Sequence, residues 1–357
     1  MVSRLAVDAD DAGQRLDNFL LRLWPGVPKS HLYRLIRSGQ VRVNGKRQPG
    51  DYRLLAGDEL RLPPVREAAG VVPQGARVAR RAVSGGAGQA ATPSGAGPAA
   101  GAAAPDPVQR SRAALAQRLT ILYEDDWLLA VDKPAAVAVH GGSGVSSGVI
   151  EQLRAARPQQ RFLELVHRID RETSGVLLVA KKRQALLALH RQMRERGTDK
   201  RYLAIVAGRW PLRTRTLNFP LHRHEAPDGD RRVSVQAGGQ EAITRATGLA
   251  RFELPALGEF SLVQADIETG RTHQIRVHLA HSGCPIVGDD KYGRFDLNRA
   301  LARAGHRRMY LHAASIGIHH PESGRPLTIA APLPAAFAQL LAAGGASWPP
   351  ARTDSSR

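Results

Sequence analysis

The sequence predicts an α+β protein that is built from two folded parts. Its 357 residues exceed the roughly 150 residues of an average domain, and a hydrophobic fraction of 43% is enough to build cores. A low-complexity segment divides the chain, and short apolar runs outnumber helical patterns beyond it. These observations indicate a small N-terminal domain, a linker and a larger domain in which β-sheet predominates.

The expected division of the chain is 1–63, 64–118, 119–345 and 346–357. From Ala82 to Pro105, 22 of 24 residues are Ala, Gly, Ser, Thr or Pro, and none is charged. Such a stretch buries too little apolar surface to offset the entropy of ordering. We therefore interpret residues 64–118 as a basic, disordered linker and residues 346–357 as a disordered tail.

The first domain begins with two helical patterns and a hairpin. Apolar residues recur at helical spacing between residues 15 and 24, which predicts an amphipathic helix. A second helix is expected from Ser30, a plausible N-cap, to residue 38, with Gly39 just beyond its end. A strand over 41–43 then meets an Asn44-Gly45 pair, the strongest short signal for a hairpin turn.

The second helix and the hairpin carry six basic residues and no acidic residue. They are Lys29, Arg34, Arg37, Arg42, Lys46 and Arg47. A run of charges is usually a solvated surface, but aligned bases on two adjoining elements suit a phosphate backbone. Residues 14–62 also resemble the αL RNA-binding motif that a small-subunit ribosomal protein shares with tyrosyl-tRNA synthetases. The resemblance implies that these six residues bind RNA.

Basic residues exceed acidic residues in every part of the chain, whose formal net charge is +19. The counts are 11 against 7 in residues 1–63, 7 against 2 in 64–118, and 33 against 23 in 119–357. The excess is therefore a property of both domains, and it indicates a polyanionic partner.

Several classes of protein are disfavoured by composition. A single cysteine, Cys284, excludes an internal disulfide framework and a multi-cysteine metal site. No run approaches 18 apolar residues, and the acidic N-terminus is unlike a signal peptide. We expect a soluble, cytoplasmic protein with no membrane partner.

Six short apolar runs beyond the linker are expected to be strands. They are Leu119–Leu122, Leu128–Val131, Val176–Ala180, Tyr202–Val206, Phe260–Ala265 and Tyr310–Ile316. Only residues 183–196 and 272–281 have a clear helical pattern. The domain is therefore predicted to be α+β and not a series of βαβ units.

Familiar catalytic motifs do not occur in the larger domain. There is no phosphate loop, dinucleotide-binding glycine pattern or zinc-protease motif. Ser174 lacks the flanking pattern of a nucleophile elbow and is expected to be a turn residue. His273, His278, His281 and Cys284 are close in sequence, but helical spacing separates the first two and Arg276 would repel a cation. No metal site is expected.

Three segments in order carry the chemical signal. They are VHRIDRETSG at 166–175, KRY at 200–202 and GRTHQIRVH at 270–278. Alone, Asp170 between two arginines would be interpreted as a surface ion pair. Together the segments resemble the pseudouridine synthases, specifically the ribosomal large-subunit family, in which one member has an αL motif ahead of the catalytic domain. The resemblance spans about residues 119–341.

Smaller landmarks fit the same family, and two features depart from it. The landmarks are Asp132-Lys133-Pro134, Gly288-Asp289, Tyr292-Gly293 and Leu311-His312-Ala313. Ile169 stands where the family usually has Leu, and the linker is unusually long.

The resemblance implies a mainly antiparallel, mixed-sheet catalytic domain and a set of site residues. Asp170 is the expected nucleophile on a flipped-out uridine, and Arg276 is expected to pair with it and keep it ionised. Tyr202 is expected to stack against the target base, with proton transfer as an alternative role. Arg168, Arg171 and Arg271 are expected to bind RNA next to the site.

The expected activity is a cofactor-independent intramolecular isomerisation of uridine to pseudouridine in large-subunit (23S) ribosomal RNA. The expected partner is that RNA or an assembling ribosomal particle, and nothing requires more than a monomer. One alternative is a pseudouridine synthase acting on tRNA or another RNA. Another is a non-catalytic RNA-binding ribosome-assembly factor, which is disfavoured because Asp170, Tyr202 and Arg276 are all present.

Overall fold

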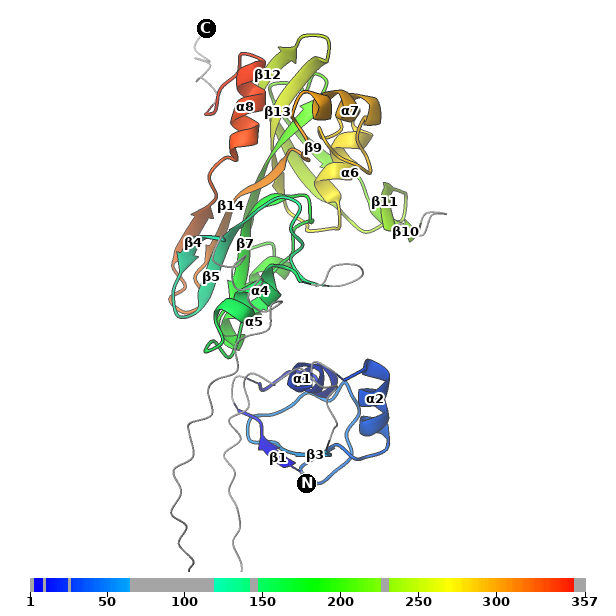
Figure 1. Cartoon of the computed structure of the whole chain (residues 1–357), viewed down its shortest axis with the longest axis vertical. Coiled ribbons are helices and arrows are strands. Elements are labelled where there is room, and N and C mark those ends of the chain that lie inside the picture. Colours follow the sequence, from blue (N-terminus) through cyan, green and yellow to red (C-terminus); the bar gives the residue numbers. More distant parts are fainter. Residues whose placement is uncertain are drawn as a thin grey trace, which may run out of the picture. The chain divides into compact units, whose positions relative to one another are not determined.

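The chain divides into two compact units, Met1–Pro107 and Val108–Arg357, in a computed structural model (Figure 1). The structure describes residues 3–8, 11–24, 27–64, 119–141, 147–225 and 231–349. The predicted linker lies outside these residues except for Pro64, as do residues 350–357 of the predicted tail. Within the described part of the chain, no helix is long and apolar enough to cross a membrane.

The first unit packs two helices against a small antiparallel sheet. Its elements are β1 (Ser3–Ala6), α1 (Leu16–Leu23), α2 (Lys29–Arg37), β2 (Arg42–Val43) and β3 (Glu59–Leu62). The strand order is β1-β3-β2. Leu20 of α1, Leu32 of α2 and Leu60 of β3 are fully buried in one cluster, so the apolar stripes of both helices face the sheet.

The start of α2 differs from the sequence prediction. The helix begins at Lys29 after Pro28, and no side chain caps it, so the prediction of Ser30 as N-cap is wrong. Pro28 can occupy this place because its extended backbone leads into the first turn and it has no N–H to satisfy. Gly39 is confirmed as the residue beyond the helix end, with φ +71°.

The Asn44-Gly45 turn is also confirmed. Both residues have positive φ, 49° and 74°, and Val43 and Lys46 exchange two backbone hydrogen bonds of 2.9 Å across the turn. The ladder partner of β2 is β3, however, and not the segment that follows the turn.

The second unit is built on a ten-stranded sheet, which confirms the α+β class. Its strands are β4 (Thr120–Glu124), β5 (Leu128–Lys133), β6 (Glu164–Leu165), β7 (Ser174–Ala180), β8 (Asp199–Ala207), β9 (Thr214–Asn218), β12 (Ile243–Leu254), β13 (Gly258–Ile267), β14 (Leu311–His319) and β15 (Pro326–Ala330). The main order is β4-β5-β7-β14-β8-β13-β12-β9, with β6 on β7 and β15 on β14. The β7–β14 pair is parallel and the other pairs of this sheet are antiparallel. A separate hairpin is formed by β10 (Leu221–Glu225) and β11 (Arg231–Val235).

More helices cover the sheet than the sequence predicted. They are α4 (Val149–Ala156), α5 (Arg183–Arg194), α6 (Gln274–His281), α7 (Phe295–Arg303) and α8 (Ala335–Ala343). The statement that only two segments are helical is therefore wrong for α4, α7 and α8. These helices have eight or nine residues, and the stability of such short helices comes mainly from tertiary packing.

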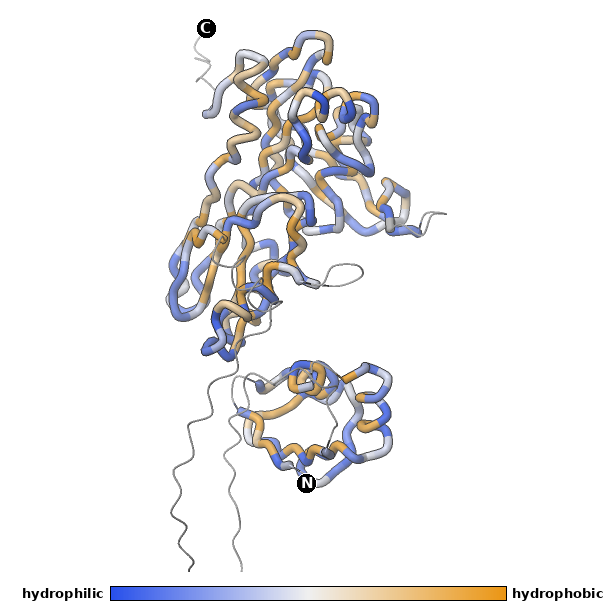
Figure 2. The backbone as a smooth tube through the Cα atoms, in the orientation of Figure 1, coloured by the Kyte–Doolittle hydropathy of each residue, from blue (hydrophilic) through white to orange (hydrophobic). Residues whose placement is uncertain are grey.

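Alternate residues of each strand pack on opposite faces of the sheet. On β5, Leu129 shares an apolar cluster with α4, whereas Leu128 shares one with α5. On β8, Ala204 belongs to a cluster with α6, and Leu203 to a cluster with α8. The half-buried Tyr202 packs against both the α4 and the α6 clusters, so these lie on one face of the sheet. Figure 2 shows the hydrophobic interior of the strands between hydrophilic loops.

Candidate active site

Asp170 lies in the loop between β6 and β7, near the centre of the sheet. Its backbone carbonyl accepts a hydrogen bond from Thr173 N at 3.1 Å, which closes a tight turn. The side chain of Asp170 is 27% exposed. The carboxylate is thus held at a fixed point of the chain and can still be reached from outside.

Gly175 brings this loop against β14. Its φ is +110°, and a β-carbon there would lie 2.2 Å from the carbonyl oxygen of Ala313. The close approach belongs to the parallel pairing of β7 with β14, in which Gly175 is opposite Ala313. Only glycine allows both the conformation and the contact. This explains why the motif that contains Asp170 ends in glycine.

Lys133 holds the far side of the β6–β7 loop, which contains Asp170. It is fully buried at the end of β5, and its Nζ donates to the carbonyl oxygens of Pro134 and Val137, both at 2.7 Å, and of Arg171 at 2.9 Å. Burial lowers the pKa of Lys133 to about 7. Sequence reasoning identified this lysine as a landmark and missed its contact with the residue next to Asp170. A lysine at the end of an apolar strand was the available signal.

Arg276 is buried on α6 and binds three acidic side chains. Its Nη1 donates to Asp170 Oδ2 at 3.2 Å. Its Nε and Nη2 donate to the two oxygens of Asp289 at 2.7 and 2.8 Å, and Nη2 also reaches Asp290 Oδ1 at 3.3 Å. The structure therefore brings Asp170 and Arg276 together, but it adds Asp289 as a bidentate partner that sequence reasoning missed.

The Arg276–Asp289 pair is charged in spite of its burial. Burial alone would raise the pKa of Asp289, but hydrogen bonds from Arg276 and from the backbone N–H groups of Lys291 and Tyr292 lower it overall. Burial opposes the charged form of Arg276, but Asp289 and Asp170 raise its pKa. The guanidinium is consequently a permanent positive charge beside Asp170.

Tyr202 stands on β8 opposite Ala313 of β14, the same residue that Gly175 approaches. Burial and the nearby charge of Asp170 both raise the pKa of Tyr202 far above its usual range. The phenol therefore keeps its proton at neutral pH. Its hydroxyl can donate a hydrogen bond, and its ring can stack against a nucleobase. The neutral phenol cannot accept a proton at the start of a reaction.

His273 is a further neighbour of Asp170. Its Nε2 lies 4.0 Å from Asp170 Oδ2, and its Nδ1 is 2.8 Å from the hydroxyl of Tyr292. Burial lowers the pKa of His273 and outweighs the opposing charge of Asp170, so the ring is neutral at pH 7. Among the described residues, no group of three or more His, Cys, Asp or Glu side chains could hold a metal ion.

The three arginines that were predicted to bind RNA near the site are exposed. They are Arg168, Arg171 and Arg271. Arg171 Nε donates to Ala136 O at 3.2 Å, and Arg271 Nε donates to Glu241 O at 3.0 Å. These backbone contacts hold two of the guanidinium groups at the surface beside the motifs that carry Asp170 and Arg276.

Ser174 is not the turn residue that the sequence suggested. It is the first residue of β7 and is buried. Its Oγ accepts a hydrogen bond from Arg308 Nη2 at 2.7 Å and lies 2.9 Å from His312 Nδ1. Because the serine oxygen accepts from Arg308, its own proton is available to His312. Ser174 thus connects the β6–β7 loop to β14.

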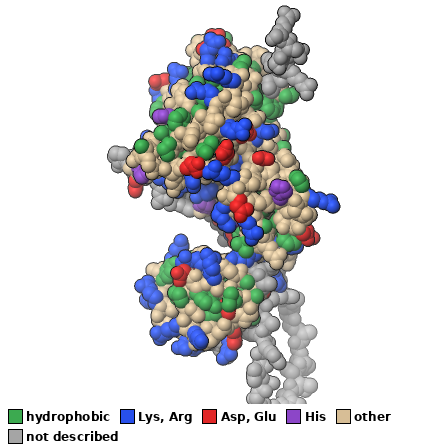
Figure 3. All heavy atoms as spheres, turned by 180° about the vertical axis from the view of Figure 1, so that it is seen from behind, with side chains coloured by type: hydrophobic (Ala, Val, Ile, Leu, Met, Phe, Trp, Pro, Cys, Tyr) green, Lys and Arg blue, Asp and Glu red, His purple; other side chains and the backbone are tan. Residues whose placement is uncertain are grey.

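The predicted RNA-binding residues of the first unit lie on α2 and the hairpin turn. Lys29, Arg34, Arg37, Lys46 and Arg47 are exposed, and Arg42 is partly buried. A β-carbon at Gly39 would lie 2.2 Å from Nε of Arg47, so the side chain of Arg47 packs over the end of α2. Figure 3 shows one face of the molecule, with Lys and Arg side chains spread over both units.

Asp17 explains why α2 keeps its place beside α1. The carboxylate is buried and accepts two hydrogen bonds from Arg15, at 3.1 and 2.7 Å, and one from Tyr33 of α2 at 2.9 Å. The hydrogen bond from Arg15 lowers the pKa of Asp17 in spite of its burial. Asp17 thereby links the two helices and fixes the orientation of α2, which carries basic residues on its exposed side.

Comparison with known proteins defines the class to which this fold and site belong. A family model described as RNA pseudouridylate synthase matches residues 127–281, and a model of the S4 domain matches residues 14–60. Human RNA Pseudouridylate Synthase Domain Containing 1 has a TM-score of 0.52 at 26% identity, over 61% of this chain and 85% of that chain. Human RNA Pseudouridylate Synthase Domain Containing 4 shares the fold with a TM-score of 0.53 at 24% identity, over 66% and 97%.

Relatives of full length narrow the assignment. Ribosomal large subunit pseudouridine synthase C of Salmonella typhimurium is 45% identical over 342 residues, which is 95% of this chain and 96% of that protein. The protein of the same name from Escherichia coli K12 is 46% identical over 334 residues, 93% of each chain. The chain therefore belongs to the ribosomal large subunit pseudouridine synthase family, an RNA-modifying isomerase family, with an S4 domain ahead of the catalytic domain. The resemblance found in the sequence is confirmed.

Proposed function

We propose that this protein converts specific uridines of large-subunit ribosomal RNA to pseudouridine, and that Asp170 is the nucleophile. The observation that carries the proposal is the contact of the partly exposed Asp170 carboxylate with the buried Arg276 guanidinium. The guanidinium offers a charged hydrogen bond to one oxygen of the carboxylate and leaves the other oxygen free to act as a nucleophile. The two relatives named ribosomal large subunit pseudouridine synthase C support ribosomal RNA as the substrate.

The reaction rearranges bonds without net oxidation or hydrolysis. The bond from the sugar carbon C1′ to N1 of uracil breaks, the base turns while it stays bound, and C1′ bonds to C5. The proton on C5 is lost and N1 gains one, so atoms and charge balance. Asp170 would attack either the uracil ring or the cationic sugar carbon that forms when the first bond breaks.

The groups around Asp170 have separate tasks in this scheme. Tyr202 presents its ring next to the carboxylate, where the uracil would stack, and its protonated hydroxyl can donate to the base as it turns. The apolar clusters on both sides of Tyr202 limit the access of water to the detached base. Lys133 and Arg276 hold the loop and the carboxylate.

Access to a uridine in folded RNA requires that the nucleotide leave its stack, at a cost of about a few kcal/mol. Exposed arginines are suited to that step. Arg168 lies two residues from Asp170, so it can enter the vacated stack or bind a flanking phosphate. Arg171 and Arg271 can bind the neighbouring backbone, and the six basic residues of the first unit would bind a more distant part of the same RNA.

The proposal implies a working protein that is a monomer in the cytoplasm and needs no cofactor. A ribosomal RNA substrate, free or in an assembling particle, sets the expected place of action.

A direct assay tests the proposal. Pseudouridine is mapped by chemical modification and primer extension after large-subunit ribosomal RNA and bulk tRNA have each been incubated with the purified protein. We expect product in the ribosomal RNA only. Product in tRNA alone would establish the alternative substrate, and no product in either would favour a non-catalytic assembly factor.

The role of Asp170 is tested by Asp170→Asn, which keeps the size of the side chain. We expect no product and an RNA affinity within about threefold of the original, because phosphate contacts dominate binding. Asp126→Asn is the matched control, since Asp126 is an exposed residue of the β4–β5 turn. Formation of pseudouridine by Asp170→Asn would exclude Asp170 as the nucleophile.

A further inference from the structure

We propose that His273 is a positioning residue for Asp170, and that the β10–β11 hairpin directs its ring N–H at the carboxylate through Tyr292. The inference rests on the proposed function, because it concerns the same carboxylate. Its basis is a hydrogen-bond path that runs from the hairpin backbone to the Tyr292 hydroxyl and the His273 ring, which faces Asp170.

His273 is held in an uncommon conformation directly before α6. Its φ is +53°, in the left-handed region that residues other than glycine enter when their surroundings fix them. The imidazole packs edge to face on the ring of Tyr292, with centroids 5.6 Å apart and an angle of 68°. The guanidinium of Arg276 lies 5.2 Å from the centre of the same tyrosine ring. The ring of Tyr292 therefore contacts both the imidazole of His273 and the guanidinium of Arg276.

The hydrogen bonds of Tyr292 decide which nitrogen of His273 carries the proton. The backbone N–H of Val233 on β11 donates to the Tyr292 oxygen at 3.0 Å. The hydroxyl proton is then free to be donated to Nδ1 of His273, 2.8 Å away. A neutral imidazole that accepts at Nδ1 has its N–H at Nε2. Nε2 is the nitrogen that faces Asp170.

Arg276 and His273 both face the same oxygen of Asp170, Oδ2. Arg276 binds Oδ2 at 3.2 Å and His273 Nε2 lies 4.0 Å from the same atom. Within the described residues, Oδ1 receives no hydrogen bond from the protein. A carboxylate with one donor can still rotate about its Cβ–Cγ bond. A second donor at Oδ2 would restrict that rotation and leave Oδ1 directed at the uridine.

The distance of 4.0 Å between His273 Nε2 and Asp170 Oδ2 is too long for a hydrogen bond. The hydrogen bond would therefore form only after the carboxylate moves. A small rotation of the carboxylate closes the distance. We expect the contact to close when uridine occupies the Oδ1 side, since the substrate then excludes the water that otherwise solvates Asp170.

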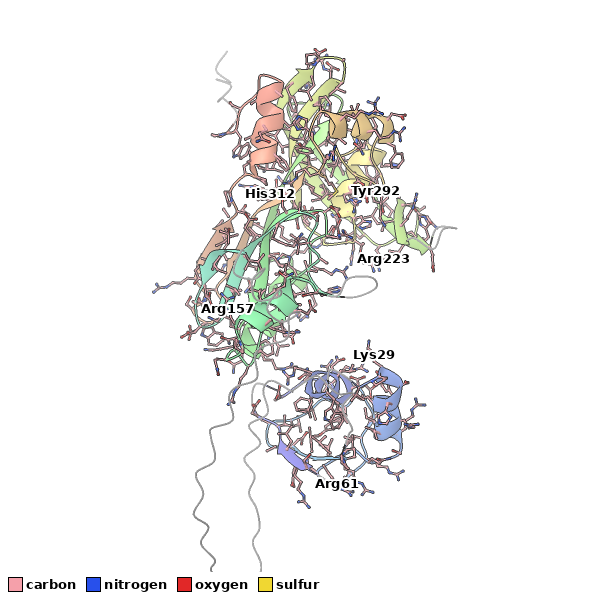
Figure 4. The ribbon with its side chains drawn as sticks, in the orientation of Figure 1. Lys29, Arg61, Arg157, Arg223, Tyr292 and His312 are labelled. Carbon is pink, nitrogen blue, oxygen red and sulfur yellow. The ribbon has the colours of Figure 1, made fainter. Side chains whose placement is uncertain are left out.

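The hairpin is connected to the start of α6 by more than Tyr292. Leu221 and Val233 of the hairpin form a small apolar cluster with Ala242 and with Val277 of α6. Arg223 of β10 donates to the hydroxyl of Thr272, the residue before His273. Figure 4 shows Arg223 on the hairpin and Tyr292 next to α6. The placement of the hairpin thus fixes both residues that lead into the helix of Arg276.

The position of the proton can be measured without any substrate. Long-range proton–nitrogen spectra of the full chain labelled with ¹⁵N-histidine report the tautomer of each ring, and His273→Gln assigns the signals by loss. We expect neutral His273 with its proton on Nε2 at pH 7, and a change of that signal in Tyr292→Phe. A proton on Nδ1, a charged ring, or a signal unaffected in Tyr292→Phe would overturn the proposal.

The positioning role is measured by single-turnover kinetics on ribosomal RNA. We expect His273→Ala to lower the maximal single-turnover rate by about tenfold or more. The protein concentration that gives half of that rate should change less than twofold. His273→Gln should recover much of the rate, because its amide N–H reaches the place of Nε2. Tyr292→Phe combined with His273→Ala should be no slower than His273→Ala alone. His281→Ala, an exposed histidine of the same helix, is the control.

Other outcomes are decisive in the opposite direction. A rate of His273→Ala equal to that of the original protein, or equal loss in the Ala and Gln variants together with lower thermal stability, would show that the histidine is only structural. If the original protein forms no pseudouridine in any RNA, the proposed function fails, whereas the tautomer measurement still decides the geometry.

Discussion

Arg276 is bound more closely by Asp289 than by Asp170. Two of its nitrogens reach Asp289 at 2.7 and 2.8 Å, and a third reaches Asp170 at 3.2 Å. Asp289 is buried and its own oxygens accept two backbone N–H groups of the following residues. The guanidinium is thus fixed before it meets Asp170, and it can orient that carboxylate without depending on it.

Replacement of Asp289 should therefore disturb both stability and catalysis. We expect Asp289→Ala to lower the free energy of unfolding by about 3–5 kcal/mol, because it leaves the buried Arg276 without its main partner. The maximal rate should fall as the guanidinium shifts. Asp290→Ala is the matched control: Asp290 is 70% exposed, and the loss should stay within about 1 kcal/mol. Urea unfolding measures both, and equal losses would contradict the assigned roles.

Gly175→Ala should be far more harmful than a glycine change that meets no neighbour. The new methyl group would lie 2.2 Å from Ala313 O at a φ of +110°, so we expect a loss of about 3 kcal/mol or more. Gly305 has a similar φ of +92°, but a β-carbon there would have no atom within 4 Å. Gly305→Ala should therefore cost only about 1–2 kcal/mol, which is the strain of the backbone conformation. Similar denaturation midpoints would show that β7 can move away from β14.

Stability should fall in acid because His312 is buried in its neutral form. Burial, aided by the charge of Arg308, lowers the pKa of His312 to about 4. An unfolded histidine titrates near 6.5, so between pH 6.5 and 4 the unfolded chain binds more protons and the folded state loses stability as the pH falls. We expect a contribution on the order of 3 kcal/mol.

His312→Asn isolates this effect. Asn can still accept a hydrogen bond from Ser174 near the place of Nδ1, but it does not titrate. Unfolding free energies at a series of pH values between 7 and 4 should fall less steeply for the variant than for the original protein. Parallel curves would mean that other groups cause the loss.

The basic side of the first unit should be visible in the salt dependence of RNA binding. Each phosphate contact that is removed should reduce the slope of log K against log salt by roughly 0.9. Arg34→Ala and Arg37→Ala on α2 should each lower the slope, whereas Arg4→Ala on β1 should not, because β3 separates β1 from β2 in the sheet. Equal effects of the three variants would indicate general charge attraction in place of a defined surface.

Local patterns were enough to predict the fold class and the central residues. Strand-forming apolar runs indicated the sheet character, and the resemblance of three short motifs in a fixed order to the pseudouridine synthases pointed to Asp170, Tyr202 and Arg276. Three short helices, α4, α7 and α8, escaped prediction. Helices of eight or nine residues are stabilised mainly by packing against the sheet, so a local pattern need not mark them, although it did mark α1, α2 and α6.

The sequence by itself determined the fold class, because periodicity is a property of neighbouring residues, and the resemblance of three short motifs to a known family gave the class of the protein. The roles of Asp170, Tyr202 and Arg276 stay predictions from that resemblance. The tertiary structure alone decided that Asp289 holds Arg276, that Lys133 binds the carbonyl of Arg171, and that His273 faces Asp170. Such contacts join segments that lie far apart in the chain. Whether they form depends on strand register and side-chain direction to within about an ångström, which no local pattern records.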